Sequence, residues 1–270
     1  MKLMARKVIA RVLGTRLASP IATALSKAGL LGLGVGIHHE FGNSGESWLY
    51  KRLFRNFPSL VCLDIGANIG AFTMEVRSLG AGEVFAYEPV PETFAILENS
   101  VRHDKSVHIF QSAVGELQGT TRFFVPLLVS DSVLASRDVD VTDVDQEHVR
   151  EIAVPITTVD LISGKLGVHI DFVKIDVEGF ELEVLKGAFN TILTKAPAVI
   201  QFEFNAHHGR RNQTMRDFKT LLPNYKMFRL ACASLRPIDV EDYLATIYTY
   251  QNIVCIHESA RGILKVLNCA

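Results

Sequence analysis

Short apolar runs alternate with helix-like segments along this chain from residue 58 onward. The apolar runs span residues 60–65, 83–88, 107–110, 171–176 and 198–204, and helical patterns occupy residues 69–79, 91–103 and 179–187. A chain that alternates in this way forms parallel strands with helices on both faces of the sheet. We therefore predict an α/β fold whose ligand binds at the carboxyl ends of the strands, where the strand order reverses.

The first of these strands leads into a glycine-containing turn, VCLDIGANIGAF, residues 61–72. Gly66 and Gly70 allow the backbone to approach a ligand closely, and the first N–H groups of the next helix point toward such a ligand. The glycine spacing is not that of the dinucleotide-binding fingerprint. Glu88 ends the second strand, where a carboxylate can accept hydrogen bonds from both hydroxyls of a ribose. A tight turn at the glycines and a helix cap at Glu88 would explain the same residues without a ligand.

The composition narrows the cellular setting more than the function. With 270 residues, 48% of them hydrophobic, the chain can bury one large core or two modest ones. The 28 Lys and Arg residues nearly balance the 29 Asp and Glu residues, so no global charge favours a nucleic acid partner. The four cysteines form no C-x-x-C pair, and free thiols are typical of a reducing, cytoplasmic compartment.

Residues 1–36 differ from the rest because they contain six Lys and Arg residues and no acid. Their apolar residues recur at three- and four-residue spacing, which predicts an amphipathic helix. Arg11 and Arg16 interrupt the apolar core that a signal peptide needs, and Arg16, Pro20 and Lys27 leave no run long enough to span a membrane. Three interpretations remain open: a helix packed on its own domain or on a second subunit, an interfacial helix on anionic lipid, and an organelle transit segment.

The predicted organisation is a basic helical segment over residues 1–40 and a single domain over residues 41–270. A long connection, residues 115–168, separates the third strand from the fourth, and its middle, residues 128–150, is rich in Asp. A segment of this length inside a compact domain is a lid, a substrate loop or a solvated insertion. Its acidity disfavours a phosphate-rich acceptor beside it.

Five blocks of sequence, in this order, resemble the FkbM-type methyltransferases, which are S-adenosylmethionine-dependent enzymes of the class I fold. The blocks are VCLDIGANIGAF, FAYEPVPETFAILENSV, SAVGE, FVKIDVEGFELEVLKGA and VIQFEFN. The resemblance covers residues 42 to 205, approximately, and its fourth block is highly specific. It implies a Rossmann-like, seven-stranded, mostly parallel sheet with helices on both faces and an antiparallel last strand, for which residues 247–256 are suitable. It also implies methyl transfer to a hydroxyl group, commonly on a sugar, a glycan or a polyketide-type molecule.

The resemblance assigns cofactor roles to particular residues. The methionine portion of S-adenosylmethionine would be cradled by Asp64, Gly66, Asn68 and Gly70, and the ribose hydroxyls would bind Glu88. The adenine would lie beside the end of the third strand, at Ser112, Ala113 and Val114. Asp176, at the end of the fourth strand, would lie near the cofactor and the transferred methyl group and serve in catalysis.

The acceptor side is expected at the ends of the fourth and fifth strands. Glu178, Glu203 and Asn205 are the candidate substrate residues, and Glu46, ahead of the first strand, is another. Glu203 and His207 are further candidate catalytic residues. His207 could deprotonate the acceptor hydroxyl, because a histidine titrates near neutral pH. Lys174 is expected to be a buried partner for one of these acids, whereas Glu178 and Glu181 could simply favour the start of a helix. No metal site is expected, although Asp176, Glu203 and Asn205 could together bind a divalent ion.

Two other functions stay open at this point. The chain could be a catalytically silent relative that binds the cofactor and acts as an interaction module through its basic N-terminal helix, although the intact acidic residues oppose this. A dehydrogenase is the second, and the missing third phosphate-loop glycine opposes it.

Overall fold

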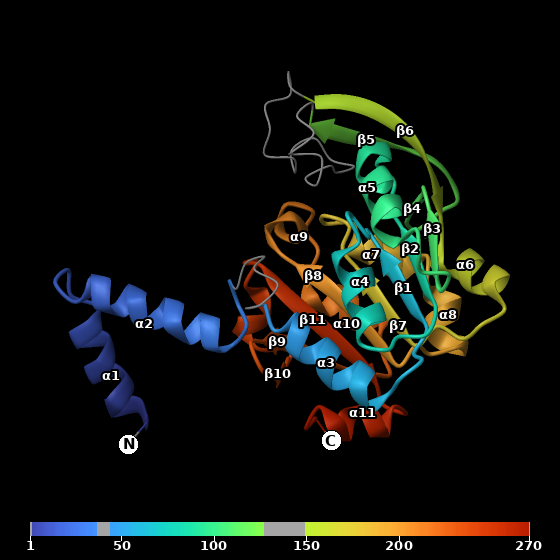
Figure 1. The fold of residues 1–270 in the computed structure, drawn as a ribbon. Helices are drawn as coiled ribbons and strands as arrows, with labels where there is room; N and C mark the ends of the chain where they lie inside the picture. The colour runs from blue at the N-terminus through green and yellow to red at the C-terminus, as the bar shows by residue number, and fades with distance from the viewer. Residues whose placement is uncertain (1, 37–43, 127–148, 270) are drawn as a thin grey trace.

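Eight strands form the central sheet of the protein in a computed structural model, which describes residues 2–36, 44–126 and 149–269 (Figure 1). Five neighbouring strands of this sheet are parallel, in the order β8-β7-β1-β2-β3. Their bounds are β1 (Cys62–Ile65), β2 (Val84–Tyr87), β3 (Val107–Phe110), β7 (Phe172–Ile175) and β8 (Val199–Phe204). Each strand lies within the apolar run that predicts it, so the α/β prediction is confirmed.

The remaining three strands are antiparallel to their neighbours. β11 (Gln251–His257) lies between β8 and β9 (Tyr225–Ala231) and is antiparallel to both, and β10 (Ser234–Pro237) pairs with β9 at the edge. The mostly parallel sheet with an antiparallel last strand is therefore as predicted. The predicted number of strands is one too low, because β10 folds back on β9 as a short hairpin strand whose local sequence carries no strong apolar signal.

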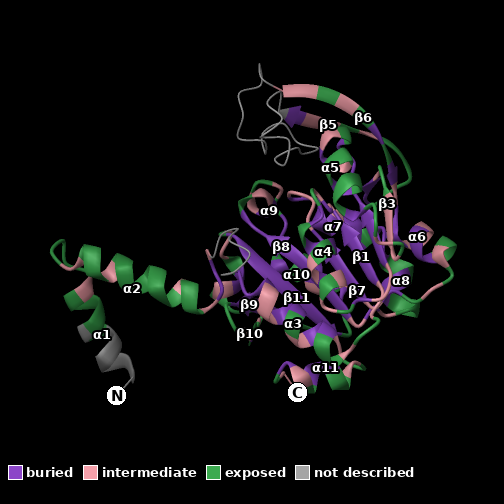
Figure 2. Cartoon of the chain, in the orientation of Figure 1, coloured by how far each residue is buried: buried purple, intermediate pink, exposed green. Residues whose placement is uncertain are grey.

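Helices cover both faces of the sheet. Alternate side chains of a strand point to opposite faces, so strands that are apolar throughout present two apolar faces to be buried. Leu63 and Ile65 of β1 pack with α6 (Val159–Leu166), α7 (Glu181–Lys186), α8 (Phe189–Thr194) and α10 (Met215–Leu221). Cys62 packs on the other face with α3 (Glu46–Asn56), α4 (Ala71–Ser78) and α11 (Arg261–Val266), and α5 (Pro91–Val101) lies over Ala86. Figure 2 shows the resulting buried central sheet. Such two-sided coverage explains why all four residues of β1 are buried.

A second, three-stranded sheet occupies part of the long connection after β3. It has the order β4-β6-β5, formed by β4 (Ala113–Val114), β5 (Gly119–Pro126) and β6 (Val149–Thr157). The expectation that residues 112–114 end the third strand is wrong, because β3 ends at Phe110 and residues 113–114 pair with β6 instead. The acidic middle of the connection, residues 127–148, lies outside the described residues.

An N-terminal arm of two helices extends from the body (Figures 1 and 2). The helices are α1 (Lys2–Leu13) and α2 (Ser19–Gly32), in place of the single predicted helix. The described side chains of α2 include no buried residue, which does not fit a helix packed along its own domain. The chain reaches the body at Gly34, where an added Cβ would lie 2.3 Å from the carbonyl oxygen of Leu230. Within the described ranges, no helix has the length and apolar character that crossing a bilayer requires.

Candidate active site

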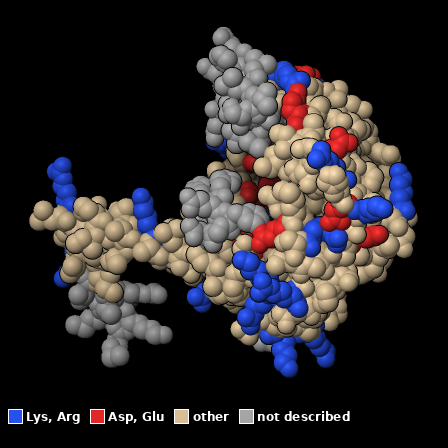
Figure 3. All heavy atoms as spheres, in the orientation of Figure 1, with Lys and Arg blue, Asp and Glu red and all other residues tan. Residues whose placement is uncertain are grey.

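Four predicted carboxylates lie at the carboxyl end of four neighbouring strands. They are Asp64 in β1, Glu88 after β2, Asp176 after β7 and Glu203 in β8. The chain leaves β1 toward β2 and β3 and then returns to β7 on the other side of β1, so the strand order reverses beside β1. Figure 3 shows Asp and Glu atoms inside a recess of the body. The tertiary structure therefore brings the predicted cofactor and substrate residues to one edge of the sheet.

Asp64 is a completely buried carboxylate. Its Oδ2 accepts a 2.6 Å hydrogen bond from the hydroxyl of Thr73 on α4, and its Oδ1 has no hydrogen-bond partner among the described residues. Burial raises the pKa of Asp64 to about 6, although Lys174 acts in the opposite direction. A buried oxygen without a partner costs about 1–3 kcal/mol. A ligand that brings a cation or a hydrogen-bond donor to Oδ1 would offset this cost.

A tight turn joins β1 to α4. Gly66 has φ +80°, and an added Cβ would lie 1.8 Å from the carbonyl oxygen of Asp176, so no side chain fits there. Asn68 also has a left-handed backbone, with φ 52°, and Gly70, with φ +91°, caps α4. The N–H of Asn68 donates to Oε2 of Glu88 over 3.0 Å. The turn and Glu88 thus hold each other in place.

Glu88 has a carboxylate that is only 6% exposed, with both oxygens in backbone hydrogen bonds. Its Oε1 accepts the N–H of Val90 over 2.9 Å. Burial raises the pKa of Glu88 to about 7, by more than these hydrogen bonds lower it. A carboxylate accepts about four hydrogen bonds, so Glu88 retains the capacity to accept two more from a pair of hydroxyls.

Lys174 is the buried cation of the site, on β7 beside Asp64 of β1. Its Nζ donates a 2.7 Å hydrogen bond to Oδ2 of Asp176. Burial acts to lower the pKa of Lys174, but the carboxylates of Asp176 and Asp64 raise it by more, so the net shift is upward. The predicted role of Lys174 as a buried partner for these acids matches this geometry.

Glu203 lies near the end of β8 and is buried. Its Oε1 accepts a 2.6 Å hydrogen bond from the hydroxyl of Tyr250, which precedes β11. Burial raises the pKa of Glu203 well above its ordinary value, and the charges of Asp176 and Glu178 raise it further. The raised pKa makes this carboxylate a stronger base than an ordinary glutamate. Tyr250 is a site residue that the sequence did not reveal, because its contact with Glu203 depends on the position of β11.

Glu178 and His207 face each other across the ends of β7 and β8, with 3.7 Å between Oε2 and Nε2. Glu178 has a left-handed backbone, with φ 52°, and Gly179 follows with φ 92°. A Cβ at Gly179 would lie 2.7 Å from Cβ of His207. Glycine at 179 is therefore what permits this close approach. Asn205 caps α9 (Ala206–Arg210) by accepting the N–H of His207 at its Oδ1, so its role toward a substrate remains a prediction.

Glu181 and His208 form a buried pair near the ends of β7 and β8. Oε1 of Glu181 accepts the N–H groups of Val177 and Gly179 over 3.1 and 3.3 Å, and its Oε2 lies 2.8 Å from Nε2 of His208. Nδ1 of His208 accepts the N–H of Asn205 over 3.1 Å, so the hydrogen of a neutral imidazole lies on Nε2, although its contact with Glu181 lacks hydrogen-bond geometry. Both side chains are completely buried. Glu181 is therefore more than an acid at the start of a helix, because it connects the loop after β7 to the end of β8.

Glu46 lies at the start of α3 in a second buried polar network. Its Oε1 accepts a 2.8 Å hydrogen bond from the side-chain amide of Gln201 on β8 and lies 3.0 Å from the hydroxyl of Tyr50. Its Oε2 accepts the hydroxyl of Ser44 over 3.0 Å. These contacts bind α3 to the sheet below the recess. Three protein side chains therefore already contact the carboxylate oxygens of Glu46, and its role toward a substrate remains a prediction.

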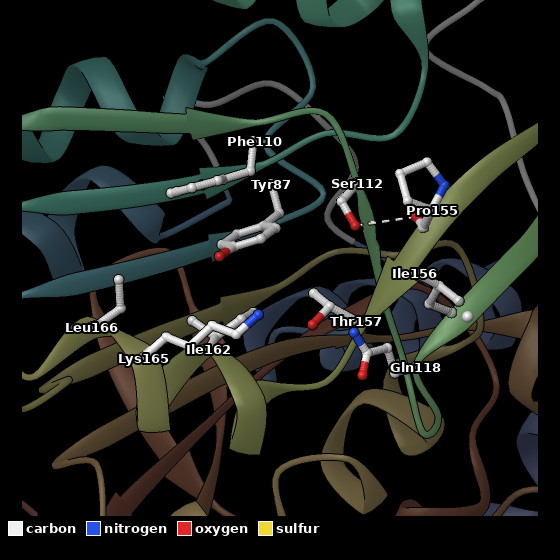
Figure 4. Close-up of a pocket in the computed structure, with 11 residues that line it drawn as sticks. Tyr87, Phe110, Ser112, Gln118, Pro155, Ile156, Thr157, Ile162, Lys165 and Leu166 are labelled. Carbon is white, nitrogen blue, oxygen red and sulfur yellow. Dashed lines mark hydrogen bonds between the residues drawn. The ribbon is translucent and has the colours of Figure 1, made fainter.

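Of the residues predicted to lie beside the adenine, Ser112 lines a cavity of about 630 Å³ between strand ends of the two sheets (Figure 4), whereas Ala113 and Val114 are not among its lining residues. The stacked rings of Tyr87 and Phe110, 4.7 Å apart, form one wall, and side chains of α6 lie opposite. The hydroxyl of Ser112 lies 3.1 Å from the carbonyl oxygen of Pro155. The contact of Ser112, Ala113 and Val114 with adenine remains a prediction.

The divalent-ion alternative gains no observation from the described residues. Among them, no group of three or more His, Cys, Asp or Glu side chains is arranged to hold a metal ion. Oδ2 of Asp176 already accepts a hydrogen bond from Nζ of Lys174.

The sheet and the site together define a class of enzyme. The protein has a mostly parallel sheet in which the antiparallel last strand lies between β8 and β9, a glycine turn after β1 and an acid after β2. This is the arrangement of the class I S-adenosylmethionine-dependent methyltransferase fold. The unpartnered Oδ1 of Asp64 and the remaining acceptor capacity of Glu88 fit a cofactor that carries an ammonium group, a sulfonium and two ribose hydroxyls. The family model of the methyltransferase FkbM domain matches residues 64–230, and the chain belongs to this family. The family to which the chain belongs is one of methyltransferases and not of dehydrogenases.

Known proteins similar to this chain include a curated relative and several solved structures. Methyltransferase 1 of Beauveria bassiana (strain ARSEF 2860) is 28% identical over 141 residues, which cover 46% of this chain and 57% of that protein. SMU.1697c of Streptococcus mutans, a putative methyltransferase solved in complex with SAH, is 8% identical with a TM-score of 0.45, over 79% of this chain and 97% of that one. A putative rRNA methylase of Clostridium thermocellum is 10% identical with a TM-score of 0.44, over 79% and 94% of the two chains.

Proposed function

We propose that this methyltransferase methylates a hydroxyl group of a sugar, a glycan or a polyketide-type small molecule. The observation that carries the proposal is the state of Glu203, a buried carboxylate with a raised pKa at the acceptor side of the site. A hydroxyl oxygen that bonds to the methyl carbon must lose its proton, and a carboxylate with a raised pKa is a stronger base for that proton than an ordinary glutamate.

The residues have distinct roles in this proposal. Bound S-adenosylmethionine supplies an electrophilic methyl group and leaves as S-adenosylhomocysteine. Its methionine portion would be held by Asp64 and residues 66–70, and its ribose by Glu88. Glu203 accepts the proton of the acceptor hydroxyl, while Tyr250 donates to Oε1 and fixes the orientation of the carboxylate.

Asp176 and His207 have further roles in this proposal. Lys174 fixes Asp176 by a 2.7 Å hydrogen bond, so the carboxylate can orient the cofactor or the acceptor without itself being a base. His207 faces Glu178 and is only 17% exposed, which makes it a second candidate base. The concentration of acids at this strand edge opposes a polyanionic acceptor and suits a neutral one, such as a sugar.

The test uses the full chain, labelled S-adenosylmethionine and a panel of hydroxyl acceptors that includes monosaccharides, glycosides and polyketide-type alcohols. We expect an alkali-stable ether product, and a Glu203→Gln variant should lose about 10²–10⁴-fold in turnover while its cofactor affinity stays within about threefold. Glu98→Gln, on an exposed residue of α5, is the matched control and should retain activity. Unchanged turnover in Glu203→Gln would exclude this carboxylate as the base, and a product methylated on nitrogen would refute the hydroxyl acceptor.

A further inference from the structure

The N-terminal arm exposes an apolar stripe that its own chain does not cover. Ile21 and Leu25, four residues apart on α2, form a row and are 60% and 58% exposed, and Leu17, in the turn before α2, is 93% exposed. On α1, Ile9 and Val12 are 56% and 59% exposed. Exposed large aliphatic side chains on two consecutive helices and in the turn between them mark an interaction surface.

The charge of the arm has one sign. Six Lys and Arg residues lie in residues 1–36, and all 29 Asp and Glu residues lie beyond them. Figure 3 shows Lys and Arg atoms on the arm and no Asp or Glu atoms there. Arg11, Arg16 and Lys27 are exposed. The surface therefore combines exposed apolar side chains with uncompensated positive charge.

We propose that α1 and α2 bind the surface of an anionic lipid bilayer and thereby hold the methyltransferase domain at the membrane. An apolar helix face enters the boundary between headgroups and acyl chains, and flanking Lys and Arg side chains meet the lipid phosphates. The family match begins at residue 64, so this property belongs to a part of the chain that the shared methyltransferase domain does not include.

Charge complementarity selects lipid over a second copy of the chain. Two arms packed against each other would bring twelve cations together without an acid from either arm, and this repulsion opposes association. An anionic bilayer instead supplies both the apolar medium for Leu17, Ile21 and Leu25 and the negative charge for the basic side chains. Each Lys or Arg near such a surface adds to the attraction.

Vesicle flotation of the full chain tests the proposal. We expect the protein to float with phosphatidylcholine vesicles that contain about 30% phosphatidylserine and not with pure phosphatidylcholine. Raising the salt from about 0.1 to 0.5 M should lower binding at least tenfold, because the charge attraction is screened. The triple variant Leu17→Asn, Ile21→Asn and Leu25→Asn should also lose at least about tenfold in binding.

Two controls separate the arm from the body and lipid from self-association. Leu117→Asn with Leu193→Asn removes apolar side chains that are 74% and 49% exposed on the body, and it should float like the unchanged protein. Cofactor affinity should be the same in all variants, since the arm lies outside the site. Equal flotation with neutral and anionic vesicles, or none with either, would overturn the proposal. A dimer in light scattering that the triple variant dissociates would show that the arm binds a second copy instead.

Discussion

Cofactor affinity should depend on pH through the ionisation of Glu88. This carboxylate is buried, and its pKa is raised from an ordinary 4.5 to about 7. Only the ionised form can accept hydrogen bonds from both ribose hydroxyls while it also accepts the N–H groups of Asn68 and Val90. At pH 8 about nine-tenths of the carboxylate is ionised, and at pH 6 about one-tenth. The dissociation constant should therefore rise about tenfold between pH 8 and pH 6.

The raised pKa of Glu88 also predicts how the stability of the cofactor-free protein changes with pH. The unfolded chain ionises this glutamate near pH 4.5, whereas the folded protein does so near pH 7. Folding is thus favoured by this group at acid pH, and the contribution is lost as the pH rises from 4.5 to 7, by up to about 3 kcal/mol. Bound cofactor should restore part of this loss at pH 8, where it pairs with the ionised carboxylate.

Isothermal titration calorimetry with S-adenosylhomocysteine between pH 6 and 8.5 would measure this dependence without turnover. Glu88→Gln cannot ionise, so it should bind at least about tenfold more weakly at pH 8 and show no slope above pH 6.5. Glu98→Gln should keep the slope of the unchanged protein, because this residue is exposed on α5. Below pH 6 the protonation of Asp64 should steepen the decline. An affinity that is constant from pH 6 to 8, or an equal slope in Glu88→Gln, would refute the reasoning.

Three further substitutions test the packing of the site. Gly66→Ala should prevent cofactor binding, since the added Cβ would overlap a carbonyl oxygen. In urea denaturation it should lower the free energy of unfolding by more than the roughly 1–2 kcal/mol that a left-handed backbone costs an alanine. Gly164→Ala, where no atom lies within 4 Å of the added Cβ, is the control. Lys174→Met should cost about 3–5 kcal/mol at pH 8 and less at pH 5, where Asp64 accepts a proton; an equal loss at both would contradict the ion-pair role. Glu181→Gln leaves one acceptor oxygen for two backbone N–H groups and His208, so kcat should fall about tenfold with little change in cofactor affinity; unchanged kcat would exclude a positioning role.

Local patterns in the sequence predicted the parallel half of the sheet and the cofactor turn. Each of the five parallel strands lies within its predicted apolar run, because a strand covered on both faces must be apolar throughout. Gly66 and Gly70 have the positive φ that a tight turn at these glycines suggested. Asp64 and Glu88 could be placed as well, since the end of a parallel strand determines which edge of the sheet a residue joins.

Pairings between distant segments could not be predicted in the same way. Tyr250 reaches Glu203 because β11 enters the sheet beside β8, and Gln201 reaches Glu46 because α3 packs beneath the sheet. The short strand β4 belongs to the second sheet and does not continue β3, because it pairs with β6. No local sequence signal indicates that pairing.

The sequence by itself determined the fold class, the family and the set of acids that the site contains, since these depend on residue type and on spacing within single strands and turns. Only the tertiary structure decided which of these acids are buried, which carry raised pKa values and which are held by Lys174, Tyr250 or His208. Burial and charge pairing depend on neighbours from other parts of the chain, and the order of the strands sets those neighbours. The same holds for the N-terminal arm, whose amphipathic pattern was visible in the sequence but whose uncovered apolar row became apparent only beside the folded body.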